Sequence, residues 1–152
     1  ADLIWLLIHT GLRLEEALML KWDAVDFANE TFTVFDTKNN RDHSLPMTEN
    51  TKTMLTRRMN ENNIFVFPSP IHSNRSMTAS KTFKRVSEET GFIFTAHDLR
   101  RTVATVAAER GYDISSIGAV LNHSRQGVTE GYVQRTLPRL KQILMDIEAE
   151  LF

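Results

Sequence analysis

TGLRLEEALMLKWDAVDF, residues 10–27, contains the change of pattern that decides the fold. Gly11 breaks one helix, and Leu14 and Leu18 then lie on one stripe of the next. From residue 25 onward, apolar and polar residues alternate in short runs that turn-forming asparagines interrupt. The stretch therefore predicts a short helix pair followed by a small antiparallel sheet.

Further helices are expected on both sides of that sheet. Apolar spacing or capping residues predict them over the ranges 2–9, 51–60, 78–89, 97–110 and 114–121. Thr78 and Asp113 can cap two of them, and Gly91 and Gly111 can stop two. A brief extended segment is expected at residues 64–70. We expect a mainly α fold with a small antiparallel β-sheet (α+β), without doubly wound alternation.

The end of the chain shows two helical signals. Thr129 can open a short helix that carries Tyr132. A later apolar stripe repeats at alternating steps of three and four residues: Leu137, Leu140, Leu144, Ile147 and Leu151. Such a stripe needs a partner surface, which is either the core of this chain or a second chain.

Size and composition limit the classes of protein. The chain has 152 residues, of which 41% are apolar, which is enough for the core of one domain. Having no cysteine, it has no disulfide or thiolate metal site. The longest apolar run, residues 3–8, is too short to span a bilayer and lacks the flanks of a signal peptide, so we expect a soluble protein. Because that run follows Ala1 at once, we also expect this chain to be cut from a longer one.

Charge is unevenly distributed along the chain. The net charge of −1 gives no sign of a nucleic-acid partner. Residues 31–87, however, carry nine basic and four acidic residues, a local net charge of +5. A solvated surface is the ordinary explanation of such a segment, and a surface for a polyanion is the other.

Several cationic residues have the chemistry that cleavage of a phosphodiester by a side chain needs. Guanidinium groups can meet the nonbridging oxygens, lysine or histidine can transfer protons, and tyrosine can be the nucleophile. His97 and Arg100 lie three residues apart at the expected start of a helix, so both project from one face near its positive end. Arg13 follows a helix-breaking glycine, and Lys38 and Arg41 lie in the second turn of the expected sheet. Each of these residues, taken alone, is more often an ordinary surface residue.

The order of the motifs carries more information than any one of them. TGLRLEEALMLKWDAVDF is followed by TKNNRDHSLPM, then by TAHDLRRTVAT, and last by LNHSRQGVTEGYVQ, in which Tyr132 follows His123 by nine residues. This set closely resembles the catalytic domain of the tyrosine recombinase (phage integrase) family, from Thr10 to Tyr132. The resemblance implies one integrase-type catalytic domain over residues 1–152, without the N-terminal core-binding domain that such enzymes usually carry. We therefore expect this chain alone to bind DNA weakly.

The resemblance also implies a role for each matching residue. Arg13 and Arg100 would grip the scissile phosphate, with Glu16 as the carboxylate that supports the site. Lys38 would protonate the departing 5′ oxygen, although Arg41 is a competing cation in the same turn.

Three further residues would complete the catalytic set. His97 would assist proton transfer from the nucleophile, and His123 would donate a hydrogen bond to a nonbridging oxygen. Tyr132 would attack phosphorus and form a 3′-phosphotyrosyl link. The sequence departs from the family at Asn122, where glycine is usual, but asparagine tolerates left-handed backbone better than most residues.

The implied partners are double-stranded DNA and further copies of this chain, in a tetramer on DNA assembled through the C-terminal helix. No metal or other cofactor is implied, and the implied location is the cytoplasm of a bacterial or phage-infected host. Candidates for contacts with the DNA backbone are Arg41, Arg75, Lys81, Lys84 and Arg85.

Three alternatives remain open from the sequence. A type IB topoisomerase would use the same chemistry without joining two sites. A noncatalytic DNA-binding or assembly module could keep the fold without the reaction. A purely helical interaction protein could use the C-terminal stripe to bind another chain.

Overall fold

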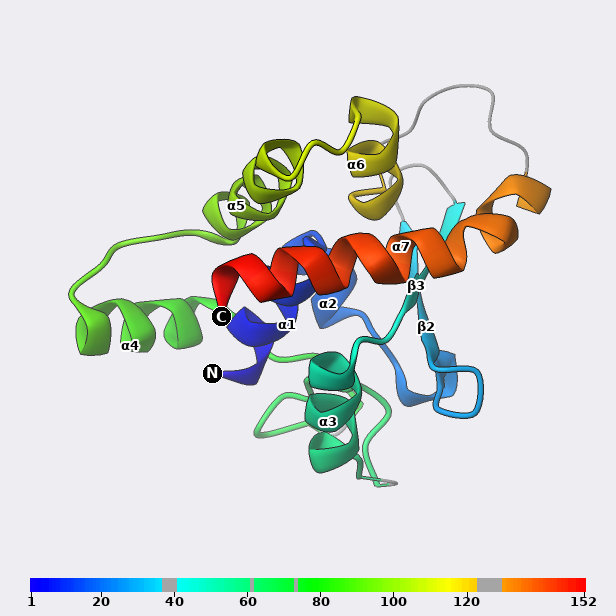
Figure 1. Ribbon diagram of the computed structural model, residues 1–152. Helices are drawn as coiled ribbons and strands as arrows, with labels where there is room; N and C mark the ends of the chain where they lie inside the picture. The colour runs from blue at the N-terminus through cyan, green and yellow to red at the C-terminus, as the bar shows by residue number, and fades with distance from the viewer. Residues whose placement is uncertain (37–40, 61, 73, 123–129) are drawn as a thin grey trace.

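The computed structural model describes residues 1–36, 41–60, 62–72, 74–122 and 130–152; it is mostly helical, with a small sheet at one side (Figure 1). The fold class agrees with the prediction. In the part of the chain that is described, no helix is long and apolar enough to cross a membrane.

The first two helices follow the pattern of the opening stretch. Helix α1 (Asp2–Thr10) ends at Gly11, whose φ of 67° is left-handed and whose N–H donates to the Leu7 carbonyl. Helix α2 (Leu14–Leu18) is only five residues long. It stops early because the chain then pairs with a distant segment: the Val66 N–H donates to the Leu20 carbonyl. Tertiary pairing therefore shortens a helix that spacing alone would extend.

The sheet is a three-stranded antiparallel meander. After the 3-10 turn η1 (Trp22–Ala24) come β1 (Val25–Asp26), β2 (Thr31–Asp36) and β3 (Arg41–Pro46), in the order β1-β2-β3. Val34 pairs with His43, and both side chains are buried. Arg41 is the first residue of β3 and pairs with Asp36, so it lies in the strand and not in the turn. Lys38 lies outside the described residues.

The helices after the sheet correct two predicted starts. Helix α3 (Glu49–Arg58) begins before residue 51, because the Thr48 side chain accepts the N–H of Thr51 and caps it. Helix α4 (Ser80–Thr90) does not use Thr78 as a cap: its N-cap is Ala79, which makes no side-chain bond. Gly91 ends α4 with a left-handed φ of 76°, as predicted.

The next two helices are capped by their own side chains. Helix α5 (Ala96–Glu109) begins with a capping box in which Thr95 and Asp98 each accept the other's backbone N–H. Helix α6 (Ile114–Val120) is capped by Asp113, as predicted. In the described residues between 58 and 80, the chain forms isolated β-bridges and no regular strand. Phe65 pairs with Lys21, and Pro68 pairs with Ser76.

The C-terminal segment is one helix, α7 (Glu130–Leu151), with Pro138 inside it, where the sequence predicts a short helix and a separate stripe. Packing holds it together in spite of the proline: α7 runs across the molecule and contacts α1, α5, α6 and β3 (Figure 1). Leu140, Leu144 and Ile147 are buried in this core. Of the two partner surfaces that the stripe could have, the structure shows the core of this chain.

Candidate active site

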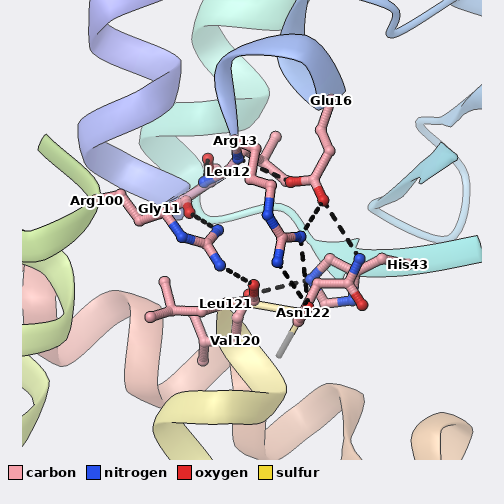
Figure 2. Close-up of polar contacts among 10 residues, drawn as sticks. Gly11, Leu12, Arg13, Glu16, His43, Arg100, Val120, Leu121 and Asn122 are labelled. Carbon is pink, nitrogen blue, oxygen red and sulfur yellow. Dashed lines mark hydrogen bonds and ion pairs between the residues drawn. The ribbon is translucent and has the colours of Figure 1, made fainter. Parts of the chain in front are cut away.

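Two arginines that lie far apart in the sequence meet at the C-terminal end of α6 (Figure 2). Arg100, on α5, is 8% exposed and donates to the Gly11 carbonyl at 2.6 Å and to the Leu121 carbonyl. Arg13, at the N-cap of α2, donates two longer hydrogen bonds to the Asn122 carbonyl, at 3.4 and 3.5 Å. The last carbonyls of a helix lack partners within it and attract cations. The end of α6 therefore draws both guanidinium groups to one place.

Glu16 fixes Arg13 against this turn. Its Oε2 accepts the Arg13 backbone N–H at 2.7 Å, and its Oε1 accepts from Arg13 Nη1 at 2.8 Å. Asn122 Nδ2 donates to the same Oε1 at 3.3 Å. Glu16 is 5% exposed, and a buried carboxylate is tolerated because it is paired and hydrogen-bonded in this way. The Arg13 side chain is 37% exposed, so Glu16 holds it on its buried side while its other side stays accessible to solvent.

Asn122 adopts the left-handed backbone that its position requires, with a φ of 52°. The predicted tolerance of asparagine is confirmed. This conformation aims the Asn122 carbonyl at Arg13, while its amide reaches Glu16. The residue that stands in place of the family's glycine thus takes part in the hydrogen bonding of the site.

Gly11 has both a conformational and a steric reason to be glycine. Its φ of 67° disfavours any side chain, and a Cβ there would lie 2.5 Å from Leu121 Cδ2 and 3.0 Å from Val103 Cγ1. This close approach brings the Gly11 carbonyl to Arg100. Gly11, the helix-breaking glycine of the sequence, therefore also allows the close packing behind Arg100.

His43 belongs to the same cluster, and the sequence prediction missed it. From β3 its Nε2 lies 3.0 Å from the Val120 carbonyl, and the residue is 5% exposed (Figure 2). Burial lowers the pKa of His43 below its ordinary value of 6.5; Arg100 and Arg13 add to this, against the opposing effects of the Val120 bond and of Glu16. A carbonyl can only accept, so Nε2 carries the proton of a neutral ring. The signal in the sequence that could have found His43 is its position on the core-facing side of a strand in which apolar and polar residues alternate.

The other predicted catalytic residues are not joined to this cluster by contacts that the structure describes. His97 lies in the first turn of α5, as predicted, but its side chain is exposed. Among the described residues, no hydrogen bond or ion pair connects His97 with Arg13 or Arg100. The backbone of Tyr132 lies in α7, and its side chain is outside the described part, as are Lys38 and His123.

The candidate DNA-backbone residues lie mostly on α4 and the loop before it. Arg75, Lys81, Lys84 and Arg85 are all exposed. Two of them have acidic neighbours one turn along the helix, Lys84 with Glu88 at 3.8 Å and Arg85 with Glu89 at 3.5 Å. The helix therefore presents both signs of charge, and such exposed pairs hold their side chains only weakly. The side chain of Arg41 is not described.

A metal site is not part of this geometry. Within the described ranges, no group of three or more histidine, aspartate or glutamate side chains could hold a metal ion. The chemical capacity of the cluster lies in its guanidinium groups, which match the oxygens of a phosphate or carboxylate.

Fold and geometry define a class: a helical domain with a small antiparallel sheet and a paired-arginine site behind the end of a short helix. Residues 1–137 match the model of the phage integrase family, and the chain belongs to that family.

Relatives and solved structures agree with this assignment. The chain is 30% identical to tyrosine recombinase XerA of Pyrococcus furiosus over 147 residues, which cover 92% of this chain and 51% of the relative. The structure resembles the integrase from mycobacterium phage Brujita, with a TM-score of 0.77 and 23% identity over 95% of this chain and 50% of the other. It also resembles the integrase of transposon Tn1549, solved in complex with circular intermediate DNA, with a TM-score of 0.68 and 20% identity over 91% of this chain and 59% of the other. This chain spans about half the length of the curated relatives it matches.

Proposed function

We propose that this chain is the catalytic domain of a site-specific recombinase that breaks and rejoins DNA through Tyr132. The observation that carries the proposal is the convergence of Arg13 and Arg100 on one turn, with Glu16 behind Arg13. Membership of the phage integrase family and the DNA bound to the Tn1549 integrase support it.

In this proposal, the two guanidinium groups bind the nonbridging oxygens of the scissile phosphate. The hydrogen bonds of Arg13 to the Asn122 carbonyl are long, so a phosphate oxygen can replace that neutral acceptor with a stronger, charge-assisted partner. Arg100 is nearly buried and keeps its orientation through two carbonyls. The guanidinium groups then stabilise the negative charge that develops on the nonbridging oxygens in the transition state.

Transesterification follows at the same phosphate. The hydroxyl oxygen of Tyr132 forms a bond to phosphorus as the bond from phosphorus to the 5′ oxygen breaks. His97 assists in taking the tyrosine proton, Lys38 gives a proton to the departing oxygen, and His123 donates a hydrogen bond to a nonbridging oxygen. The ester bond is kept in the protein–DNA link, so the reverse reaction with another strand end needs no added energy source.

Recombination between two sites needs several copies of the enzyme, and we propose a tetramer on DNA assembled through α7. Because the apolar stripe of α7 lies in the core, a deletion of residues 137–152 would unfold the domain as well as weaken assembly. Met145, on the same helix, is 47% exposed and offers a cleaner test. We expect Met145→Glu to reduce two-site joining while single-site cleavage stays unchanged. Equal joining would remove α7 from the interface.

A nicked suicide DNA substrate tests the cleavage chemistry. We expect a covalent protein–DNA adduct that is lost in Tyr132→Phe. The chain has two tyrosines, and Tyr112→Phe is the matched control because the Tyr112 hydroxyl donates to Asp146. An adduct that persists in Tyr132→Phe, or no adduct with DNA that is shown to be bound, would contradict the proposal. Relaxation of supercoils without joining of two sites would indicate a type IB topoisomerase instead.

A further inference from the structure

Three successive carbonyls at the end of α6 are each held by a side chain from a different element. Val120 accepts from His43 on β3, and the next two carbonyls accept from Arg100 on α5 and from Arg13 at the start of α2. The arginine contacts belong to the site described above. The first contact, that of His43, has no part in the proposed reaction.

His43 is part of a packed antiparallel sheet. His43 lies within β3, directly across from Val34 on β2, and both side chains are buried. The neighbouring Leu45 is fully buried and pairs with Phe32. The His43 ring is therefore held by the packed sheet, and its Nε2–H bond to the Val120 carbonyl fixes the turn of α6 relative to that sheet.

We propose that His43 is a positioning residue for strand cleavage: by holding the Val120 carbonyl, it sets the turn whose next two carbonyls orient Arg100 and Arg13. The last residue of this turn, Asn122, has a left-handed backbone. The inference rests on the proposed function, since it concerns the geometry of that reaction.

The charges around His43 are consistent with a neutral donor. The described charged groups that face it are Glu16 on α2, Arg13 at the start of α2 and Arg100 on α5. A protonated ring would add a third positive charge beside two arginines, and burial further lowers the pKa of His43. The neutral ring gives one N–H to one carbonyl without competing with the arginines for an incoming phosphate.

The kinetic test compares two substitutions at one position. His43→Leu fills similar space but has no donor, whereas His43→Gln keeps an N–H of comparable reach. At saturating suicide substrate we expect the rate of adduct formation to fall about 10- to 100-fold in His43→Leu, the effect of a misplaced catalytic group, and to be largely restored in His43→Gln. The apparent affinity for DNA should change little, because both arginines remain.

Leu55→Ala is the matched control for lost stability. It opens a cavity in the core on α3, which carries neither His43 nor the two arginines. We expect it to lower the melting temperature while keeping the rate of adduct formation close to that of the unaltered chain. A Leu55→Ala rate as low as that of His43→Leu, or a His43→Leu rate equal to that of the unaltered chain, would overturn the positioning role.

Imidazole ¹⁵N spectra test the contact apart from any activity. We expect the His43 ring to be mostly neutral at pH 6.5, with its proton on Nε2, because burial lowers its pKa below that value. A protonated His43 at that pH, or a proton on Nδ1 alone, would overturn the inference. If the unaltered chain forms no adduct, the proposed function fails; if it forms one that His43→Leu does not slow, only the positioning role fails.

Discussion

Two polar clusters in this fold each contain a buried histidine, and they differ in how their charges balance. We define the arginine site as Arg13, Glu16, His43 and Arg100. Its hydrogen-bond donors outnumber its one carboxylate, and they also donate to backbone carbonyls. In the second cluster, which we call the α7 anchor, a single carboxylate collects all the donors. Its members are His9, Thr48, Asn50 and Glu148.

The α7 anchor is closed around Glu148. His9 Nδ1 lies 2.7 Å from Oε1, Thr48 donates to Oε1 at 2.6 Å, and Asn50 donates to Oε2 at 3.0 Å. The His9 ring stacks between Trp5 and Phe152, with centroids 3.6 and 4.5 Å away. These contacts tie α1, the start of α3 and the end of α7 together, and the carboxylate is satisfied by protein groups.

Burial and hydrogen bonding therefore do not by themselves indicate a functional site. Both clusters contain buried and extensively hydrogen-bonded groups, but of the two only the arginine site has an excess of cationic groups that donate to neutral carbonyls. In the proposed function, such an arrangement favours an incoming phosphate, because a phosphate binds a guanidinium more strongly than a carbonyl does. The α7 anchor has no comparable excess and holds the fold together.

The largest expected effect breaks the α7 anchor. Glu148→Ala leaves His9 and the Thr48 hydroxyl buried without their acceptor, and we expect a loss of about 3–5 kcal/mol in the free energy of unfolding. Glu148→Gln keeps one carbonyl oxygen and should lose less. Glu150→Ala is the control on the same helix, since Glu150 is exposed and pairs only with Arg110 among the described residues. Urea unfolding measures all three, and equal losses would show that the anchor is not special.

The next effect tests the arginine site by activity. Arg100→Lys keeps the charge but cannot reach both the Gly11 and Leu121 carbonyls as a planar fork does. We expect the rate of adduct formation to fall about 100-fold or more, the effect of losing one transition-state donor. Arg57→Lys, at an exposed residue paired with Asp2, should leave the rate unchanged. A small loss in Arg100→Lys would mean that only charge matters at this position.

A smaller effect concerns the close packing behind Arg100. Gly11→Ala combines left-handed strain with a clash against Leu121, whereas Gly91→Ala has the same kind of φ but nothing within 4 Å of the added Cβ. The difference between the two losses isolates the clash, and we expect it to be about 1–3 kcal/mol, as for other overpacked cores. Thermal unfolding measures it. Equal losses would show that the turn relaxes around the methyl group.

The smallest effect lies at the surface, where Glu30 joins α7 to α3. The side-chain bonds from Lys141 and Lys52 lower the pKa of Glu30 to about 2. A carboxyl whose pKa is lowered on folding stabilises the protein above its ordinary pKa, and this stabilisation is lost as pH falls from about 4.5 toward about 2. Melting temperatures of the unaltered chain and Glu30→Gln should therefore differ slightly near neutral pH and converge in that acidic range. A constant difference would assign the effect to packing.

Local patterns predicted much of the backbone. Gly11, Gly91 and Asp113 act as the sequence predicts, because stops and caps depend on neighbouring residues alone. The predictions failed where distant contacts compete: α2 stops early because the chain pairs with residue 66, and α7 continues past Pro138 because its stripe packs on four other elements.

The candidate site was predictable in part for the same reason. Motif order identified Arg13, Glu16 and Arg100. The residue types near position 43 do not indicate that His43 contacts the end of α6. The contact joins residues 77 positions apart and exists only after sheet and helix have packed.

By itself, the sequence determined the helix-rich fold class, the turns at its glycines and the family, because these follow from short-range backbone preferences and from ordered motifs. Only the tertiary structure decided that two arginines and a neutral histidine would meet the last carbonyls of α6, and that α7 would close over its own core. Both outcomes depend on carbonyls and apolar side chains that find their partners only when distant segments come together.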